Sequence, residues 1–335
     1  MVGGWLLAVC AMLWVMIVLG GATRLNGSGL SIMEWAPLSG VLPPWSEAEW
    51  QRLFTLYQHI PQYALVNDGF GLDGFKHIFW LEWTHRLWGR LIGAVFLVPL
   101  VVLGIRGAIR RALWLRLAGL FVLGGLQGAV GWFMVASGFA ADSTAVSAYR
   151  LVAHLSLALL LYSALLWTAL STLRSGPVRP QRSRLLSVLL AAAVVVLPLT
   201  IVAGGFVAGL HAGLIYNQFP GMGAGLFPAD YAVLHPLLRN LTENAPAAQF
   251  DHRLLATLTA LLVTAAALVG LQRSQPRAVR VAAACLGLAV IFQYGLGVVT
   301  LLWVVPVGLA TAHQAVAVVV LTATLAAIHI QRRMP

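Results

Sequence analysis

The strings Glu82-Trp83-Thr84-His85-Arg86 and Gln249-Phe250-Asp251-His252-Arg253 decide how the rest of this chain is read. Each string lies in an apolar stretch, and each is followed by a second histidine in a later apolar stretch, His154 or His313. An ionisable side chain inside a membrane span is costly and calls for a functional reason. Each half of the chain therefore carries one pair of intramembrane histidines, and only the first pair has a glutamate one helical turn away.

The composition predicts an all-α integral membrane protein. Hydrophobic residues make up 60% of the 335 residues and charged residues only 9%, which exceeds what a soluble domain can bury. Eight apolar stretches approach the roughly 20 residues that a helix needs to cross the bilayer. They cover residues 4–23, 78–104, 112–135, 146–172, 185–209, 247–271, 278–303 and 308–330. The lipid bilayer is thus the first predicted partner.

Arginine placement predicts the topology. The chain has a net charge of +11, and its arginines gather after the second, fourth, sixth and eighth spans. The positive-inside rule makes these segments, and with them both termini, cytoplasmic. The absence of a transit peptide before the first span favours a multi-pass protein of the bacterial cytoplasmic (inner) membrane. We expect no nucleic-acid partner, because these short clusters lack a groove-reading module.

The two halves repeat each other. Gly20-Gly21 corresponds to Gly204-Gly205, and Gln127 with Gly131 corresponds to Gln293 with Gly297. We predict a tandem duplication that gives two pseudo-symmetric four-helix bundles, residues 1–176 and 177–335, in the same orientation. The long outer segment 24–76 belongs to the first bundle, and its tryptophans and prolines predict an ordered cap.

The four repeated histidines lie near the outer ends of their spans, about 8 to 14 Å deep at 1.5 Å per residue. Histidines at one depth on two parallel helices can hold a flat haem, and such pairs suit haem better than zinc. We therefore predict two haem sites near the outer face. Their iron ligands are His85 with His154 and His252 with His313. The candidates for binding haem propionates are Arg86, Arg253 and Arg150.

Glu82 marks the difference between the halves. It precedes His85 by three residues on one helix face, whereas the matching Gln249 cannot ionise. We predict that Glu82 is a catalytic general base or stabilises a cation at the first site only. A purely structural ion pair with Arg86, four residues further on, is the alternative.

The chain resembles the haem A synthases of bacteria and mitochondria. Residues 20–35, 79–90 and 213–222 carry the resemblance, which covers nearly the whole chain. Residues 24–76 contain no cysteine, so the chain is similar to the cysteine-free branch that includes the mitochondrial enzymes. His211 stands where the family commonly has aspartate, and its role is left open.

The resemblance implies an oxidoreductase that converts haem O to haem A for terminal oxidases. A ring methyl group becomes a formyl group, with water as the oxygen source and an unidentified electron acceptor. In this family the first half takes haem O, here at His85 and His154, and the second holds a haem b cofactor, here at His252 and His313. Glu82 would be the catalytic carboxylate. Implied partners are a haem O synthase and oxidase assembly factors, and a homo-oligomer is compatible with the sequence.

Two other classes of protein compete with this interpretation. A dihaem b-type membrane electron carrier that exchanges electrons with quinone would use both sites as redox relays. Equivalent ionisable groups at both sites would favour the electron carrier. The first site has Glu82 where the second has Gln249, which favours the synthase. A transporter would have broken spans with carboxylates at the midplane, whereas the polar residues here lie near the outer ends.

Overall fold

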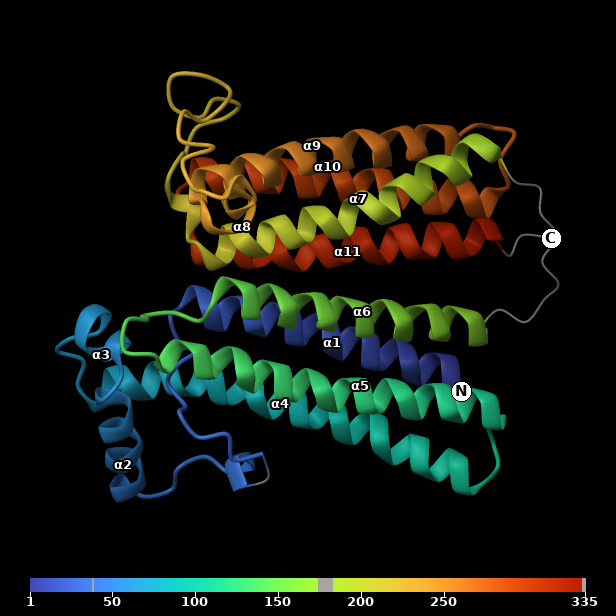
Figure 1. The fold of residues 1–335 in the computed structure, drawn as a ribbon. Coiled ribbons are helices and arrows are strands. Elements are labelled where there is room, and N and C mark those ends of the chain that lie inside the picture. Colours follow the sequence, from blue (N-terminus) through green and yellow to red (C-terminus); the bar gives the residue numbers. More distant parts are fainter. Residues whose placement is uncertain (38, 174–182, 333–335) are drawn as a thin grey trace. The chain divides into compact units, whose positions relative to one another are not determined.

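The protein is all-α and has eight helices of membrane-spanning length within the part that the computed structural model describes, residues 1–37, 39–173 and 183–332 (Figure 1). These helices are α1 (Val2–Leu25), α4 (Leu72–Ile105), α5 (Arg111–Ala136), α6 (Ala148–Leu173), α7 (Arg184–Gly209), α9 (Ala245–Gly270), α10 (Arg277–Leu302) and α11 (Val307–Arg332). The predicted fold class and the number of spans are confirmed.

Local signals set most helix ends within a few residues of the predicted ones. The Ser183 side chain accepts a hydrogen bond from the Leu186 amide and begins α7, and Asn244 caps α9 in the same way. The largest difference is at α4, which begins at Leu72 rather than residue 78. Its two extra turns form because Phe75 is fully buried against the outer segment, which extends the apolar face beyond the span.

The outer segment between α1 and α4 is an ordered cap, as its composition predicted. It contains η1 (Ser39–Val41), α2 (Glu47–Gln58) and α3 (Pro61–Val66). The Ser46 hydroxyl accepts a hydrogen bond from the Glu49 amide and so fixes the start of α2. A buried cluster joins the cap to the ends of α4 and α5, and its members are Leu30, Ile32, Trp50, Leu53, Phe54, Tyr57, Ile60, Phe75, Ile78, Phe79 and Val135.

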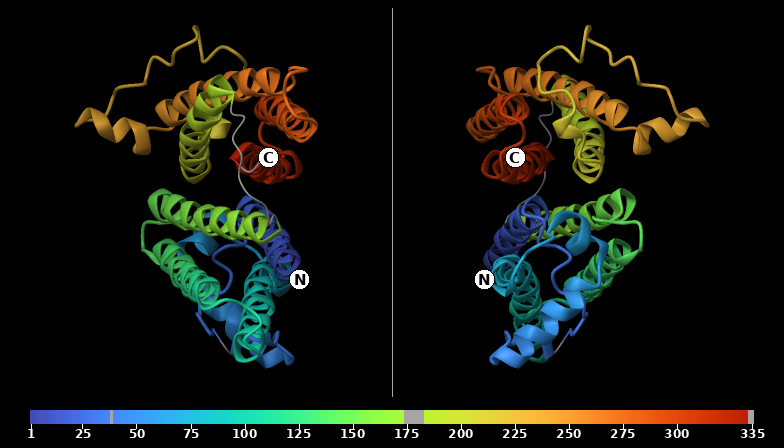
Figure 2. Two further views of the ribbon diagram at one scale, coloured as in Figure 1. Left: turned by 90° about the vertical axis from the view of Figure 1, so that its right-hand side faces the viewer. Right: turned by 90° about the vertical axis from the view of Figure 1, so that its left-hand side faces the viewer.

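The chain divides into two compact units, one of residues Ala8–Tyr162 and one of Met1–Leu7 with Ser163–Pro335. In the second unit α7 packs against α9 and α11, and α10 packs against the same two helices, which closes a four-helix bundle. In the first unit α4 packs against α5, and the Trp88 indole on α4 donates a hydrogen bond to the Met12 carbonyl on α1. Figure 2 gives two further views of these helices. This arrangement fits the predicted duplication, and the predicted boundary at 176 lies outside the described residues.

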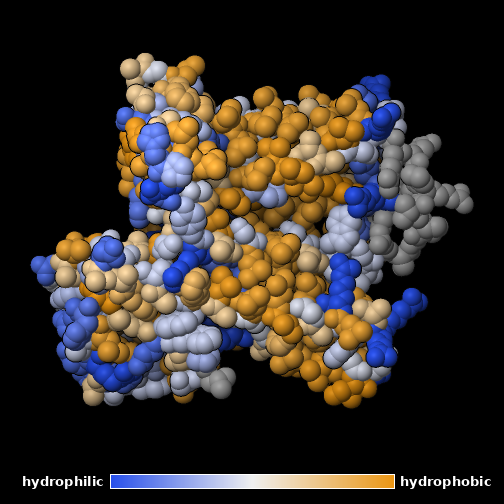
Figure 3. Space-filling model, in the orientation of Figure 1, coloured by the Kyte–Doolittle hydropathy of each residue, from blue (hydrophilic) through white to orange (hydrophobic). Residues whose placement is uncertain are grey.

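Polar residues concentrate towards the helix ends. Figure 3 shows apolar side chains over the middle of the helices and hydrophilic ones towards their ends. Arg106 and Arg110 lie between α4 and α5, and Arg273 lies between α9 and α10, at the helix ends opposite those that the outer segments join. Arg174, Arg179 and Arg182, which also entered the topology prediction, lie outside the described residues.

The outer segment of the second half is less helical than the cap. It contains only η3 (Ala212–Leu214), η4 (Leu237–Arg239) and α8 (Asn240–Glu243). Buried asparagines hold it together: the Asn244 amide donates hydrogen bonds to the carbonyls of Asp230 and Tyr231. Asn244 thereby connects the N-terminal end of α9 to a segment that has little regular structure of its own.

Candidate functional site

The second histidine pair comes together inside the α7–α11 bundle. The ring centres of His252 and His313 lie 6.4 Å apart, and their planes are inclined at 88°. Two imidazoles that bind one metal from opposite sides have centres about 6 Å apart, since each metal–nitrogen bond is about 2 Å and each nitrogen lies about 1 Å from its ring centre. The spacing of this pair therefore fits an iron held between two histidines.

Hydrogen bonding fixes which nitrogen His252 offers to a metal. Its Nδ1 lies 3.0 Å from the Thr200 carbonyl oxygen, which can only accept, so Nδ1 carries the proton. Nε2 is left free to bind a metal. Thr200 is itself held in place, because its hydroxyl lies 2.7 Å from that of Thr259 and donates to the Leu255 carbonyl.

The first histidine pair is also brought together. His85 on α4 and His154 on α6 lie close enough to interact electrostatically. The Gln127 amide donates a 2.9 Å hydrogen bond to the His154 carbonyl, and Gln293 donates one of 3.0 Å to the His313 carbonyl. All four histidines are half-buried, so their rings keep surface that a bound group would cover.

Each pair offers a metal two imidazole nitrogens. Within the described residues no group of three or more histidine, cysteine, aspartate or glutamate side chains could hold a metal ion. A structural zinc site needs four protein ligands and a catalytic one usually three. A haem iron already has four porphyrin nitrogens and needs only axial ligands, so the donor set fits haem.

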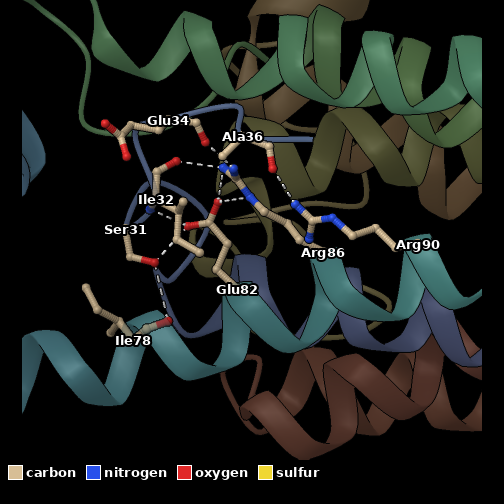
Figure 4. A network of polar contacts seen from close by, with 8 residues as sticks. All are labelled: Ser31, Ile32, Glu34, Ala36, Ile78, Glu82, Arg86 and Arg90. Atoms are coloured by element: carbon tan, nitrogen blue, oxygen red, sulfur yellow. Dashed lines mark hydrogen bonds and ion pairs between the residues drawn. The ribbon is translucent and has the colours of Figure 1, made fainter. Parts of the chain in front are cut away.

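Glu82 is buried in the first half of α4 and bound on both carboxylate oxygens (Figure 4). Oε2 accepts hydrogen bonds from the Ser31 hydroxyl at 2.7 Å and from the Ile32 amide at 2.9 Å. Oε1 accepts from the Arg86 guanidinium, with Nε at 3.0 Å. The ion pair expected as the structural alternative is therefore present, and the same carboxylate also holds the chain that follows α1.

Arg86 continues this attachment. Its Nη2 donates to the Ile32 carbonyl at 2.6 Å and its Nη1 to the Glu34 carbonyl at 2.7 Å. We call Glu82, Arg86 and residues 31–34 the first clamp. Most Arg86 donors are thus engaged within the protein, and the Trp132 ring covers the guanidinium with its centre 5.6 Å away. Arg90, one turn deeper, donates to the carbonyls of residues 36 and 37.

Arg253 makes the matching contacts in the second half. Its Nη2 donates to the Tyr216 carbonyl at 2.7 Å, and its Nη1 donates to the carbonyls of Gln218 and Gly221 at 3.1 Å. Gln249 donates to the same Tyr216 carbonyl over a long 3.4 Å. We call Gln249, Arg253 and residues 216–221 the second clamp.

The second clamp differs from the first in charge. No carboxylate in the described part of the chain lies within ion-pair distance of Arg253, and its buried Nε has no hydrogen-bond partner there. The Oε1 atom of Gln249 is likewise buried without a partner. Arg253 therefore keeps an uncompensated positive charge next to His252, which suits an anionic group on a bound ligand.

Arg150 faces α5. Its Nη1 donates to the Phe133 carbonyl at 2.8 Å, and its guanidinium lies 3.8 Å from the centre of the Phe133 ring. Sequence reasoning missed Ser31 as the partner of Glu82, and it missed Trp132. Neither is marked by helical spacing, because both reach Glu82 and Arg86 from other segments of the chain.

The eight membrane-length helices of the described residues, with one histidine pair in each half, define a polytopic membrane protein suited to holding metal-bearing groups between paired imidazoles. Residues 3–325 match the family described as cytochrome oxidase assembly protein (COX15-CtaA). The chain belongs to this family, which confirms the resemblance seen in its motifs.

Similar proteins carry one name. The heme A synthase of Granulibacter bethesdensis is 60% identical over 98% of this chain and 87% of its own length. That of Rhodospirillum centenum is 47% identical over 98% of this chain and 87% of its own, and that of Nitrosomonas eutropha is 46% identical over 96% and 91%.

Proposed function

We propose that this protein is a haem A synthase, a membrane oxidoreductase that converts the substrate haem O to haem A. The observation that carries the proposal is a single buried carboxylate, Glu82, beside one of two otherwise matching histidine pairs, with Gln249 at the other. Relatives of that name, up to 60% identical over nearly the whole chain, support it. Two equivalent electron-transfer sites would have no need of this difference.

In this proposal the second half, residues 177–335, would hold a haem b cofactor through His252 and His313. The 6.4 Å spacing of their rings and the Thr200 hydrogen bond to Nδ1 support it. When bound, this haem supplies reversible one-electron transfer. Arg253 is the preferred propionate partner, because its buried charge has no carboxylate partner among the described residues.

The first half, residues 1–176, binds haem O between His85 and His154 in this proposal. Oxidation of a methyl group to a formyl group with water as the oxygen source releases four electrons and four protons. The electrons must leave to an acceptor outside the chain, and the protons need a nearby base. Arg86 and Arg150 remain propionate candidates, although each is engaged by contacts within the protein.

Glu82 is the base that we propose. Its Oε2 already accepts a hydrogen bond from the Ser31 hydroxyl at 2.7 Å, so a proton from water can pass to the serine oxygen while the serine proton moves to the carboxylate. No contact has to break, because the transfer runs along an existing hydrogen bond. Arg86 and the Ile32 amide hold the carboxylate in place beforehand.

The setting of the reaction follows from the sequence predictions. We propose that the protein lies in the bacterial inner membrane with both termini in the cytoplasm and both sites near the outer face. A haem O synthase is the natural supplier of the substrate, and oxidase assembly factors are the natural recipients of the product.

Haem extraction from the purified protein, followed by mass analysis, tests the proposal. We expect haem B together with haem O or haem A, and an increase in haem A when haem O is supplied with an oxidant. Two haem B molecules per chain and no modified haem after haem O is supplied would overturn the proposal and favour the electron carrier.

A further inference from the structure

Three histidines of the two pairs rest against a glycine on the neighbouring helix. A methyl group placed on the glycine would lie 2.7 or 2.8 Å from the Cε1 atom of the imidazole in each case. The pairs are Gly131 with His154, Gly204 with His252, and Gly297 with His313. Carbon atoms in a packed interior prefer separations of about 3.5–4.0 Å, so any side chain at these positions displaces the ring.

The contact recurs on three different helix pairs, α5 with α6, α7 with α9, and α10 with α11. On α5 and α10 a glutamine stands four residues before the glycine. Gln127 and Gln293 bind the histidine carbonyl, while Gly131 and Gly297 receive the ring. The glutamine thus fixes the main chain of the histidine, and the glycine limits where its ring can lie. At His154 the glutamine also contacts the ring, because Gln127 Nε2 lies 3.1 Å from His154 Nδ1. On α7 the Thr200 carbonyl is the added polar contact.

We propose that Gly131, Gly204 and Gly297 are positioning residues that set the direction of the ligand nitrogen of the neighbouring histidine. The inference rests on the proposed function for the identity of the bound groups. Each glycine acts through the imidazole and does not itself touch the metal. An iron–imidazole bond depends on ring direction, so a displaced ring costs ligand affinity even though the histidine is still present.

Gly20 makes a different contact, so we expect an alanine substitution there to have a different effect on haem binding from a substitution at the other three glycines. A methyl group on Gly20 would meet the His85 Nε2 atom at 3.1 Å, with Cδ2 next at 3.7 Å. His85 therefore presents Nε2 to α1, whereas the other three histidines present Cε1. A contact of 3.1 Å needs a smaller adjustment than the contacts of 2.7 or 2.8 Å at the other three histidines.

The chain offers matched controls on the same helices. A methyl group on Gly128 of α5 or on Gly295 of α10 would meet no atom within 4 Å. These residues lie close to Gly131 and Gly297 along their helices, and alanine is a better helix former than glycine. Replacing either control glycine by alanine should leave haem binding unchanged.

The test compares Gly297→Ala and Gly204→Ala with Gly295→Ala in the full-length protein purified in detergent. The measurements are haem b per chain and the electron paramagnetic resonance spectrum of the ferric haem, neither of which depends on turnover. We expect haem b affinity to fall about ten- to a hundredfold in the first two variants and to stay unchanged in the third. Gly131→Ala should keep haem b and lose haem O binding, and Gly20→Ala should have the smallest effect. Wild-type haem content and spectra in Gly297→Ala would overturn the inference.

The two claims fail in different ways. The proposed function is refuted if the wild-type chain binds no haem in its second half. The role of the glycines is refuted if the wild-type chain binds haem and Gly297→Ala binds it equally well. A second comparison covers the case in which Gly297→Ala does not fold. The double variant Gly297→Ala/His313→Ala removes the ring that the new methyl group would meet. If the single variant does not fold, recovery of the fold in the double variant supports the contact. Continued misfolding would overturn the inference, since the glycine would then serve helix packing alone.

Discussion

The two clamps share their arginine contacts and differ in one partner. Arg86 donates to the carbonyls of Ile32 and Glu34, and Arg253 donates to those of Tyr216 and Gln218, at the same spacing along each outer segment. The arginine contact therefore occurs in both halves and attaches the outer segment of each half to α4 or α9. What distinguishes the first clamp is the buried carboxylate that neutralises its arginine.

The difference separates a structural role from a chemical one. If the carboxylate were needed only to attach the outer segment, the second clamp would need one too, and it does without. Glu82 adds a bond to the Ser31 hydroxyl that has no counterpart at Gln249. The first half thus has a buried carboxylate one helical turn before His85, and the second has an arginine without a carboxylate partner among the described residues, next to His252 in the chain.

Arg86→Ala should give the largest difference between the two halves, measured as a loss of stability. It leaves Glu82 buried without its cation, and removal of one partner of a buried ion pair costs about 3–5 kcal/mol. Arg253→Ala strands no carboxylate and should cost only about 1–3 kcal/mol. Thermal unfolding of the two variants in detergent measures the difference. The double variant Arg86→Ala/Glu82→Gln should recover part of the loss, and equal destabilisation by both single variants would contradict the comparison.

Glu82→Gln should reduce haem A formation about 10²- to 10³-fold, the usual cost of removing one preorganised catalytic group. Haem b content should be unchanged, because the second pair is separate. Chromatography of extracted haems gives both quantities from one sample. Ser31→Ala is the companion variant: it removes the proposed relay and should lower the rate while the Arg86 contact remains. Undiminished haem A in Glu82→Gln would remove Glu82 from the mechanism.

Gln249→Glu sharpens the comparison from the other side. The new carboxylate should pair with Arg253 and compete with a haem propionate for it, so we expect haem b to bind about ten- to a hundredfold more weakly, equivalent to one hydrogen bond to a charged group. No haem oxidation should appear in the second half. Haem titration of the purified apo-protein checks this, and tighter binding would show that Arg253 does not hold a propionate.

The smallest expected difference between the halves is in how the stability of the outer segments depends on pH. The first should lose stability at low pH and the second at high pH. Hydrogen bonding to Arg52 holds the pKa of Glu34 below its usual value of 4.5, so this contribution to stability is present above pH 4.5 and is lost as the pH falls further. Burial and the bond to Asp251 raise the pKa of Tyr231 from 10.0 to about 12, so its contribution is present below pH 10 and is lost towards pH 12. Glu34 is exposed and Tyr231 is only half-buried, so each effect should stay below about 1 kcal/mol. Hydrogen exchange of residues 39–76 and 211–244 at the two extremes measures them, and the reverse assignment would contradict the contacts.

Much of the fold was predictable because it depends on local composition. A stretch of about 20 apolar residues must form a helix in a bilayer, whatever its neighbours are. The start of α4 was predicted six residues late, because Phe75 is buried by the cap, and the partners of a residue outside the span cannot be read from hydropathy. The repeat also placed the four histidines in register before any contact was known.

The sequence by itself determined the spans, the repeated histidines and the replacement of glutamate by glutamine, since each depends on residue type and spacing along one helix. The sequence repeat also aligned Gly131 with Gly297, but it did not predict that either glycine contacts a histidine ring. Only the tertiary structure decided that these glycines receive an imidazole, that Ser31 reaches Glu82, and that Arg253 has no carboxylate partner among the described residues. The physical reason is that these contacts join different helices and loops, and their distances depend on how those segments pack rather than on any local pattern.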